Sequence, residues 1–188
     1  MTGVILFRAQ PFHNGHMYMV QKAYNDCRKM NCDLYIFIGS ADKYGTKRNP
    51  LPIELREHII TDTIWKEYNG EDCGHIHIIS LNDLSDEANN THGWGKYLYT
   101  HIVDNTNDSE ITIYYSDKPE IMLSWFDNDI REHISFKFLK RYDGICATDV
   151  RQAFLDNNKT KILDTVPYVV FKNYYDEIRK YIVEAYIE

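Results

Sequence analysis

Two histidines and an arginine lie close together near the start of the chain, in the segment RAQPFHNGH at positions 8–16. Arg8 follows an apolar run typical of a buried strand, so its guanidinium is expected where that strand ends. Gly15 can adopt the positive φ of a tight bend, which places His16 in the first turn of a helix. Free backbone N–H groups and the helix dipole favour anions there. With His13 three residues earlier, the segment predicts a polyphosphate site built without a Walker-type loop.

The histidine pair also has a second interpretation. The pattern His-x-x-His is common by chance, and each of His13 and His16 can be a surface group or a helix-capping group. Their position favours the binding role, because the pair lies at the first strand-to-helix turn of an expected parallel sheet.

A second cluster, Thr148-Asp149-Val150-Arg151, lies at another expected helix start. Thr148 is a suitable N-cap, and its hydroxyl can instead donate to a phosphate oxygen. Arg151 is one helical turn further on, so its side chain can reach the same place. The alternative is a plain capped helix with a surface arginine, and the spacing alone favours that alternative.

Small residues and cations follow the second apolar run, at 34–38. The segment Gly39-Ser40-Ala41 permits close approach of the backbone to a ligand. Arg48 lies in the polar loop that comes next, which is locally basic because it also contains Lys43 and Lys47. A solvated surface loop is the alternative, particularly for the two lysines.

Trp94 stands between two glycines in an expected long polar loop. An aromatic ring in such a place can stack on a nucleotide base or on a pyridine ring. The alternative is that the indole packs the loop onto the body of the protein, which is the commoner role of a tryptophan.

Hydrophobic periodicity predicts the elements that position these residues. Apolar runs predict strands at 4–7, 34–38, 75–79, 111–115 and 134–138. Helical patterns cover 15–30, a region from Pro52 to about 68, a short stretch ending before 104, and most of the chain's end, with starts near 148 and after Pro167. The first strand, helix and strand form a βαβ unit, which implies parallel pairing.

The expected fold is therefore α/β, a single doubly wound domain with a mainly parallel five-stranded sheet. Residues 1–146 form its α/β core, and residues 147–188 form C-terminal helices. Ligands of such sheets bind beyond the carboxyl ends of the strands. The loops that meet this condition are 8–16, 39–50, 81–95, 116–119 and 141–151.

Composition limits the classes of partner. The chain has 188 residues, of which 44% are hydrophobic and 26% charged, and its formal net charge is −7. The negative balance argues against general affinity for nucleic acid or acidic membranes. No signal-peptide pattern and no bilayer-length apolar run is present, so we expect a cytoplasmic protein with reduced cysteines.

Together, these clusters resemble the nucleotidylyltransferase superfamily, whose HxGH signature appears here as HNGH at 13–16. Within it the chain is most similar to nicotinamide mononucleotide (NMN) adenylyltransferases of the archaeal type. Their opening, Arg-x-Gln-Pro-x-His-x-Gly-His, is matched throughout residues 8–16. Further similarities follow in chain order: Gly39-Ser40-Ala41, Arg48-Asn49-Pro50, Glu54 with Arg56, Trp94, and Thr148-Asp149-Val150-Arg151. The resemblance implies the Rossmann-like fold of that superfamily.

Three segments depart from the family pattern, at 7–9, 146–147 and 116–119. Phe7 stands where glycine is usual, and Ala9 also differs from the common residue. Cys146-Ala147 replaces a serine–glycine pair and removes a hydroxyl. The segment 116–119 stands where a glycine–asparagine pair is common. The first two departures are expected to lower phosphate affinity, and the third to alter the contact with the acceptor.

The resemblance implies adenylyl transfer from ATP to NMN, giving NAD and pyrophosphate by direct in-line displacement. The catalytic groups that it assigns to the phosphates are Arg8, His13, His16, Arg48 and Arg151. Further contacts with ATP fall on Phe7, Ala9 and Thr148, and contacts with the acceptor on Gly39, Ser40, Asn49 and Trp94. Mg²⁺ is expected to bridge the phosphates and keep several waters, without protein ligands. The family's habit also implies a homo-oligomer.

Two other functions stay open. One is the same chemistry on another phosphate acceptor, such as phosphopantetheine or a phosphorylated alcohol. The other is a non-catalytic nucleotide-sensing module, since a fold does not determine a function.

Overall fold

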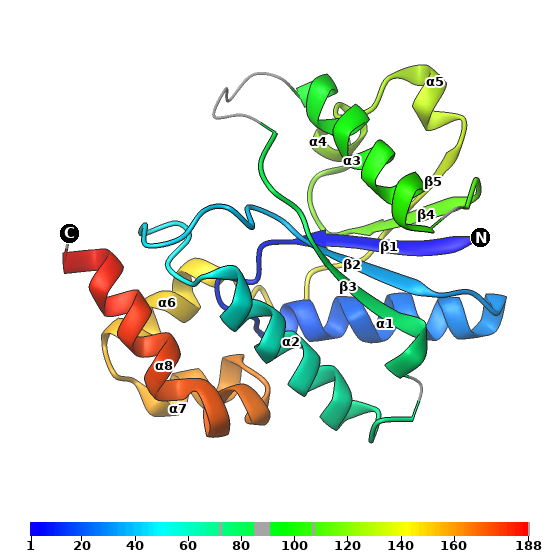
Figure 1. The fold of residues 1–188 in the computed structure, drawn as a ribbon. Coiled ribbons are helices and arrows are strands. Elements are labelled where there is room, and N and C mark those ends of the chain that lie inside the picture. Colours follow the sequence, from blue (N-terminus) through cyan, green and yellow to red (C-terminus); the bar gives the residue numbers. More distant parts are fainter. Residues whose placement is uncertain (72, 85–90, 107, 188) are drawn as a thin grey trace.

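Five parallel strands form the centre of the computed structural model, which describes residues 1–71, 73–84, 91–106 and 108–187. In sheet order they run β3-β2-β1-β4-β5 (Figure 1). Their bounds are β1 Thr2–Phe7, β2 Leu34–Ile38, β3 Ile76–Ser80, β4 Ile111–Tyr115 and β5 Ile134–Phe138. The inner strands are apolar runs because both of their faces are covered. The predicted α/β fold with a five-stranded parallel sheet is confirmed.

Helices cover both faces of the sheet (Figure 1). One face is covered by α1 Asn14–Met30 and α2 Ile53–Glu67, and α6 Ala147–Leu155, α7 Lys159–Thr165 and α8 Tyr168–Ile187 extend the same hydrophobic core beside them. The other packs against α3 Thr91–Thr106, α4 Pro119–Leu123 and α5 Asn128–Arg131. A short 3₁₀ helix, Cys73–His75, precedes β3. Among the described residues, no helix is long and apolar enough to cross a membrane.

Three strands have the predicted bounds, whereas β1 begins at Thr2 and β3 is shifted by one residue. The prediction that Trp94 lies in a loop is wrong, because it lies inside α3, which also continues past the predicted end before Asp104. Gly95, one of the two glycines that suggested a loop, has a packing role here. A Cβ on Gly95 would lie 1.8 Å from the carbonyl oxygen of Trp125. Most of the predicted polar stretch before this helix, at 85–90, lies outside the described residues.

Arg56 of α2 joins the carboxyl ends of β1 and β2. Its side chain is fully buried, and its guanidinium donates to the carbonyl oxygens of Arg8 (2.9 Å), Gly39 (2.9 Å) and Ser40 (3.0 Å). Burial lowers the pKa of Arg56 to about 10, so the group remains charged at neutral pH. Charge-assisted bonds of this kind are stronger than neutral ones, and they hold the two strand ends at a set separation.

The loop after β1 is held by two further side chains. The amide of Gln10 donates to the carbonyl of Leu51 (3.0 Å) and accepts from the N–H of the same residue (2.8 Å). Arg151 of α6 donates to the carbonyl of Gln10 (2.8 Å). The loop that carries the predicted phosphate site is therefore attached to both α2 and α6.

Replacing Arg56 with methionine is expected to lower the free energy of unfolding by about 3 kcal/mol or more, because three buried carbonyls lose their donor. Lysine at this position should recover only part of the loss, since one ammonium cannot span both strand ends. Urea unfolding measures the effect. Lys66→Met, on the exposed side of the same helix, is the control. A loss in Arg56→Met no larger than in that control contradicts the role given to Arg56.

Candidate functional site

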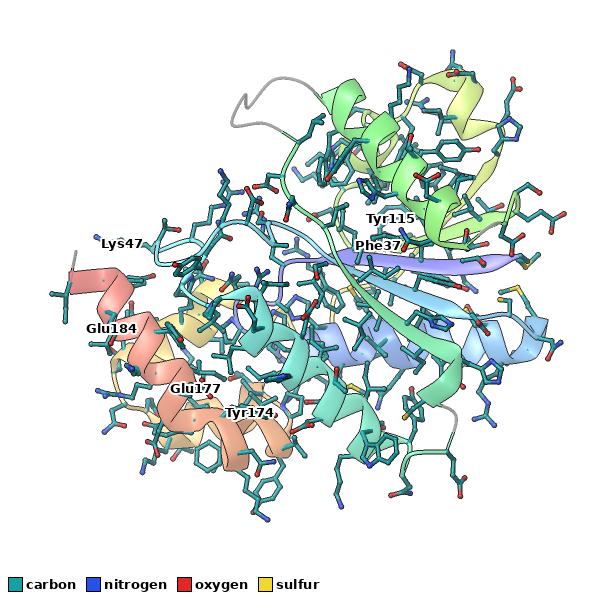
Figure 2. All side chains as sticks on the ribbon, in the orientation of Figure 1. Phe37, Lys47, Tyr115, Tyr174, Glu177 and Glu184 are labelled. Atoms are coloured by element: carbon teal, nitrogen blue, oxygen red, sulfur yellow. The ribbon has the colours of Figure 1, made fainter. Side chains whose placement is uncertain are left out.

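A cleft of about 650 Å³ opens at the carboxyl ends of β1, β2 and β4. The chain winds from β1 through β2 to β3 and then returns to place β4 beside β1. The cleft thus lies at the topological switch point, where doubly wound sheets bind ligands. Figure 2 shows Tyr115, at the end of β4, on the side of the sheet that faces α3.

The side chains of His13 and His16 both accept hydrogen bonds from backbone N–H groups at the start of α1. His13 is the N-cap, and its Nδ1 accepts from the N–H of Gly15 (3.1 Å). Its own backbone N–H donates to Nδ1 of His16 (3.3 Å). Both Nδ1 atoms therefore act as acceptors, so the proton of each neutral ring lies on Nε2. The capping role considered for these residues is confirmed, and it leaves one N–H donor free on each ring.

Both histidines are neutral at physiological pH. Burial lowers the pKa of His13 to about 4. Burial lowers the pKa of His16 well below its usual value too, and the neighbouring His13 adds to the effect. The two rings stack at 3.8 Å between centroids, and Phe7 packs against His16 at 4.7 Å. Phe7 thus forms part of the wall that keeps the histidines uncharged.

Arginines supply the positive charge. Arg8 and Arg48 line the cleft together with His13 and His16. In the described part of the chain, neither guanidinium takes part in a hydrogen bond or an ion pair. Burial lowers the pKa of Arg8, and the charge of Arg48 lowers it further, which is evidence that the two groups interact. A site with two unpaired arginines and two neutral N–H donors is suited to a polyphosphate.

Arg48 belongs to a turn that is closed by its own hydrogen bonds. The N–H of Thr46 donates to the carbonyl of Asn49 (3.2 Å), and the N–H of Asn49 donates to the hydroxyl of Thr46 (3.1 Å). The ammonium of Lys47 lies 5.7 Å from the ring of Tyr186, near the end of α8 (Figure 2). The C-terminal helix therefore contacts the turn that carries Arg48.

Four of the predicted site residues do not line the cleft. Arg151 is buried and donates to Gln10 and to the hydroxyl of Thr148 (3.2 Å), so neither side chain of that cluster faces the cleft. Ala9 is buried with a φ of 52°, and Asn49 is buried in the turn. Direct contact of these four residues with a ligand stays a prediction. Gly39, Ser40 and Trp94 do line the cleft, as does Phe7.

Several residues that line the cleft were not among the predicted site residues. Trp125 follows α4 and meets Trp94 at 6.4 Å in an edge-to-face arrangement. Asp83 follows β3, and its carboxylate accepts from the hydroxyl of Ser40, with Oδ1 at 2.9 Å and Oδ2 at 3.1 Å. Only the position of Asp83, in a loop beyond a strand's carboxyl end, could have indicated it.

The loops 116–119 and 141–147 meet across the cleft. Arg141 pairs with Asp117 at 2.6 Å, and both side chains are exposed. Cys146 is the N-cap of α6, and its thiol donates to the carboxylate of Asp149 (3.1 Å). Among the residues that the structure describes, no three His, Cys, Asp or Glu side chains are grouped to hold a metal ion.

Several solved structures resemble this chain. A bifunctional NMN adenylyltransferase/ADP ribose pyrophosphatase from Francisella tularensis gives a TM-score of 0.70 at 21% identity, over 95% of this chain and 51% of that one. The same protein complexed with AMP and a manganese ion gives 0.66 at 20%, over 95% and 52%. A NadR protein in complex with NAD and AMP-PNP gives 0.58 at 19%, over 90% and 45%. What they share with this chain is the fold.

No protein-family model matches the sequence, and no curated protein matches it either. The chain spans about half the length of the solved structures just described.

The free energy of unfolding should fall as the pH drops from about 6.5 to about 4. Over that range His13 binds a proton in the unfolded chain but stays unprotonated in the folded protein. His13→Asn keeps an acceptor for the cap but does not titrate, so it should remove about 3 kcal/mol of this fall. Urea unfolding at a series of pH values measures it. His58→Gln, which changes an exposed histidine of α2, should keep the wild-type dependence. An unaltered pH dependence in His13→Asn is the opposing result.

Proposed function

We propose that this chain transfers an adenylyl group from ATP to NMN, giving NAD and pyrophosphate. The observation that carries the proposal is the pair of capped, neutral histidines beside Arg8 and Arg48, at the first strand-to-helix turn. The names of the similar structures support it, since they include an NMN adenylyltransferase and complexes with AMP, NAD and AMP-PNP. The match of residues 8–16 to the family's opening supports the same acceptor.

The reaction joins an oxygen of the NMN 5′-phosphate to the α-phosphorus of ATP. The bond from that phosphorus to the bridging oxygen of the β-phosphate breaks, and its electron pair leaves with pyrophosphate. The protein forms no covalent bond, so catalysis rests on alignment and on stabilising the charge that develops on the phosphate oxygens. Arg8 and Arg48 stabilise that charge, and the Nε2–H groups of His13 and His16 donate to it.

Mg²⁺ enters as part of the substrate, bound to the phosphates of ATP. Among the described residues no three His, Cys, Asp or Glu side chains are grouped to hold a metal ion, and Asp117 of the cleft is paired with Arg141. Phosphate oxygens and water therefore supply the ligands of the ion, in keeping with the preference of Mg²⁺ for oxygen.

The remaining predicted contacts divide between the two substrates. Phe7 borders the ATP side through its packing on His16. Gly39, Ser40 and Trp94 form the acceptor side, where a small residue at the end of β2 leaves room for the ligand. Arg151 acts through Gln10 as a positioning residue. Ala9, Thr148 and Asn49 shape the same loops, and assembly into a homo-oligomer is part of the proposal.

Purified protein with ATP, Mg²⁺ and a panel of acceptor phosphates tests the function directly, with pyrophosphate and dinucleotide both measured. NMN should give equal amounts of NAD and pyrophosphate. Binding of ATP without any product would favour a nucleotide-sensing module, and product with another acceptor alone would overturn the choice of NMN.

Asparagine and glutamine at position 16 separate catalysis from capping. His16→Asn keeps an acceptor near Nδ1 but removes the Nε2–H donor, so turnover should fall about 10²–10³-fold. His16→Gln offers a donor near Nε2 but disturbs the cap. It should therefore retain more activity than His16→Asn but be less stable. Full turnover in His16→Asn contradicts the mechanism.

A further inference from the structure

Asp83 is a cleft carboxylate that forms no ion pair among the described residues, although its charge also acts on Arg8 and Arg56. Its oxygens share the single hydroxyl hydrogen of Ser40, and within the described residues no ion pair includes it. Asp117, the other described acid that lines the cleft, is paired with Arg141 at 2.6 Å. A partly buried negative charge with only a neutral donor is electrostatically available to a ligand.

The aromatic wall of the cleft lies within reach of this charge. The rings of Trp94 and Trp125 both line the cleft, and Trp94 packs on Tyr97 at 5.4 Å. Burial raises the pKa of Tyr97, and the charges of Asp42 and Asp83 raise it further. Asp83, Trp94 and Trp125 thus border the same ligand space.

Two separate interactions favour a cation on this side of the cleft. The faces of tryptophan rings attract positive charge, and a nearby carboxylate adds a direct Coulomb attraction. The unpaired guanidiniums of Arg8 and Arg48 border the same cleft and favour anions. The cleft thus suits an acceptor that has an anionic phosphate and a cationic ring.

We propose that Asp83 makes this site selective for acceptor nucleotides whose aromatic ring carries a positive charge. The inference rests on the proposed function and specifies its substrate class. NMN belongs to this class, because its pyridinium ring carries a positive charge. Reduced NMN has nearly the same shape but a neutral dihydropyridine ring, and nicotinate mononucleotide carries a carboxylate that Asp83 repels. Both should be poorer acceptors than NMN.

The test compares kcat/KM for NMN and for reduced NMN in wild-type protein and in Asp83→Asn, which keeps an acceptor for Ser40. The ratio of NMN to reduced NMN should fall about three- to tenfold in the variant, the size expected for one partly screened charge. Nicotinate mononucleotide should become a relatively better acceptor. Asp104→Asn removes an equal charge from an exposed residue of α3 that does not line the cleft, and should preserve the ratio.

An unchanged ratio in Asp83→Asn, or an equal change in Asp104→Asn, overturns the proposal. If wild-type protein makes no dinucleotide at all, the proposed function fails. Calorimetric binding then still tests the selectivity, which requires NMN to bind more tightly than reduced NMN and which equal affinities contradict.

Discussion

The reciprocal hydrogen bonds at the start of α1 determine what the histidines of this site can do. Each ring uses Nδ1 to cap the helix, and burial against Phe7 and neighbouring apolar side chains keeps both rings uncharged. The same hydrogen bonds that begin α1 therefore determine the tautomer of each ring. As a result, His13 and His16 are expected to meet phosphate oxygens as neutral N–H donors. The positive charge is left to arginines that are free of partners among the described residues.

This arrangement requires the loop between β1 and α1 to be held firmly. Arg56 joins the carbonyls at the ends of β1 and β2, while Gln10 is bound by Leu51 on one side and Arg151 on the other. Buried arginines without carboxylate partners are costly unless carbonyl groups satisfy them. Their presence here is best understood as positioning, since pre-set donors lose little free energy to reorganisation when a charged ligand binds.

Apolar runs predicted the sheet closely, because buried parallel strands must be continuous in hydrophobicity. The helical placement of Trp94 was missed because Gly95 suggested a loop, whereas it permits close packing on the Trp125 backbone. Spacing alone favoured a capped helix with a surface Arg151, whereas Arg151 is buried on Gln10, which only the tertiary fold reveals; its contact with phosphate stays a prediction. Asp83 also depends on long-range contacts that no local pattern encodes.

The charge and tautomer of the two histidines are the most direct test of this account. Nitrogen-15 NMR of the imidazole rings, assigned with the His13→Asn and His16→Asn variants, reports which ring nitrogen carries the proton. The account predicts that at neutral pH both rings are neutral and protonated on Nε2. An imidazolium at either residue, or a proton on Nδ1, would contradict it.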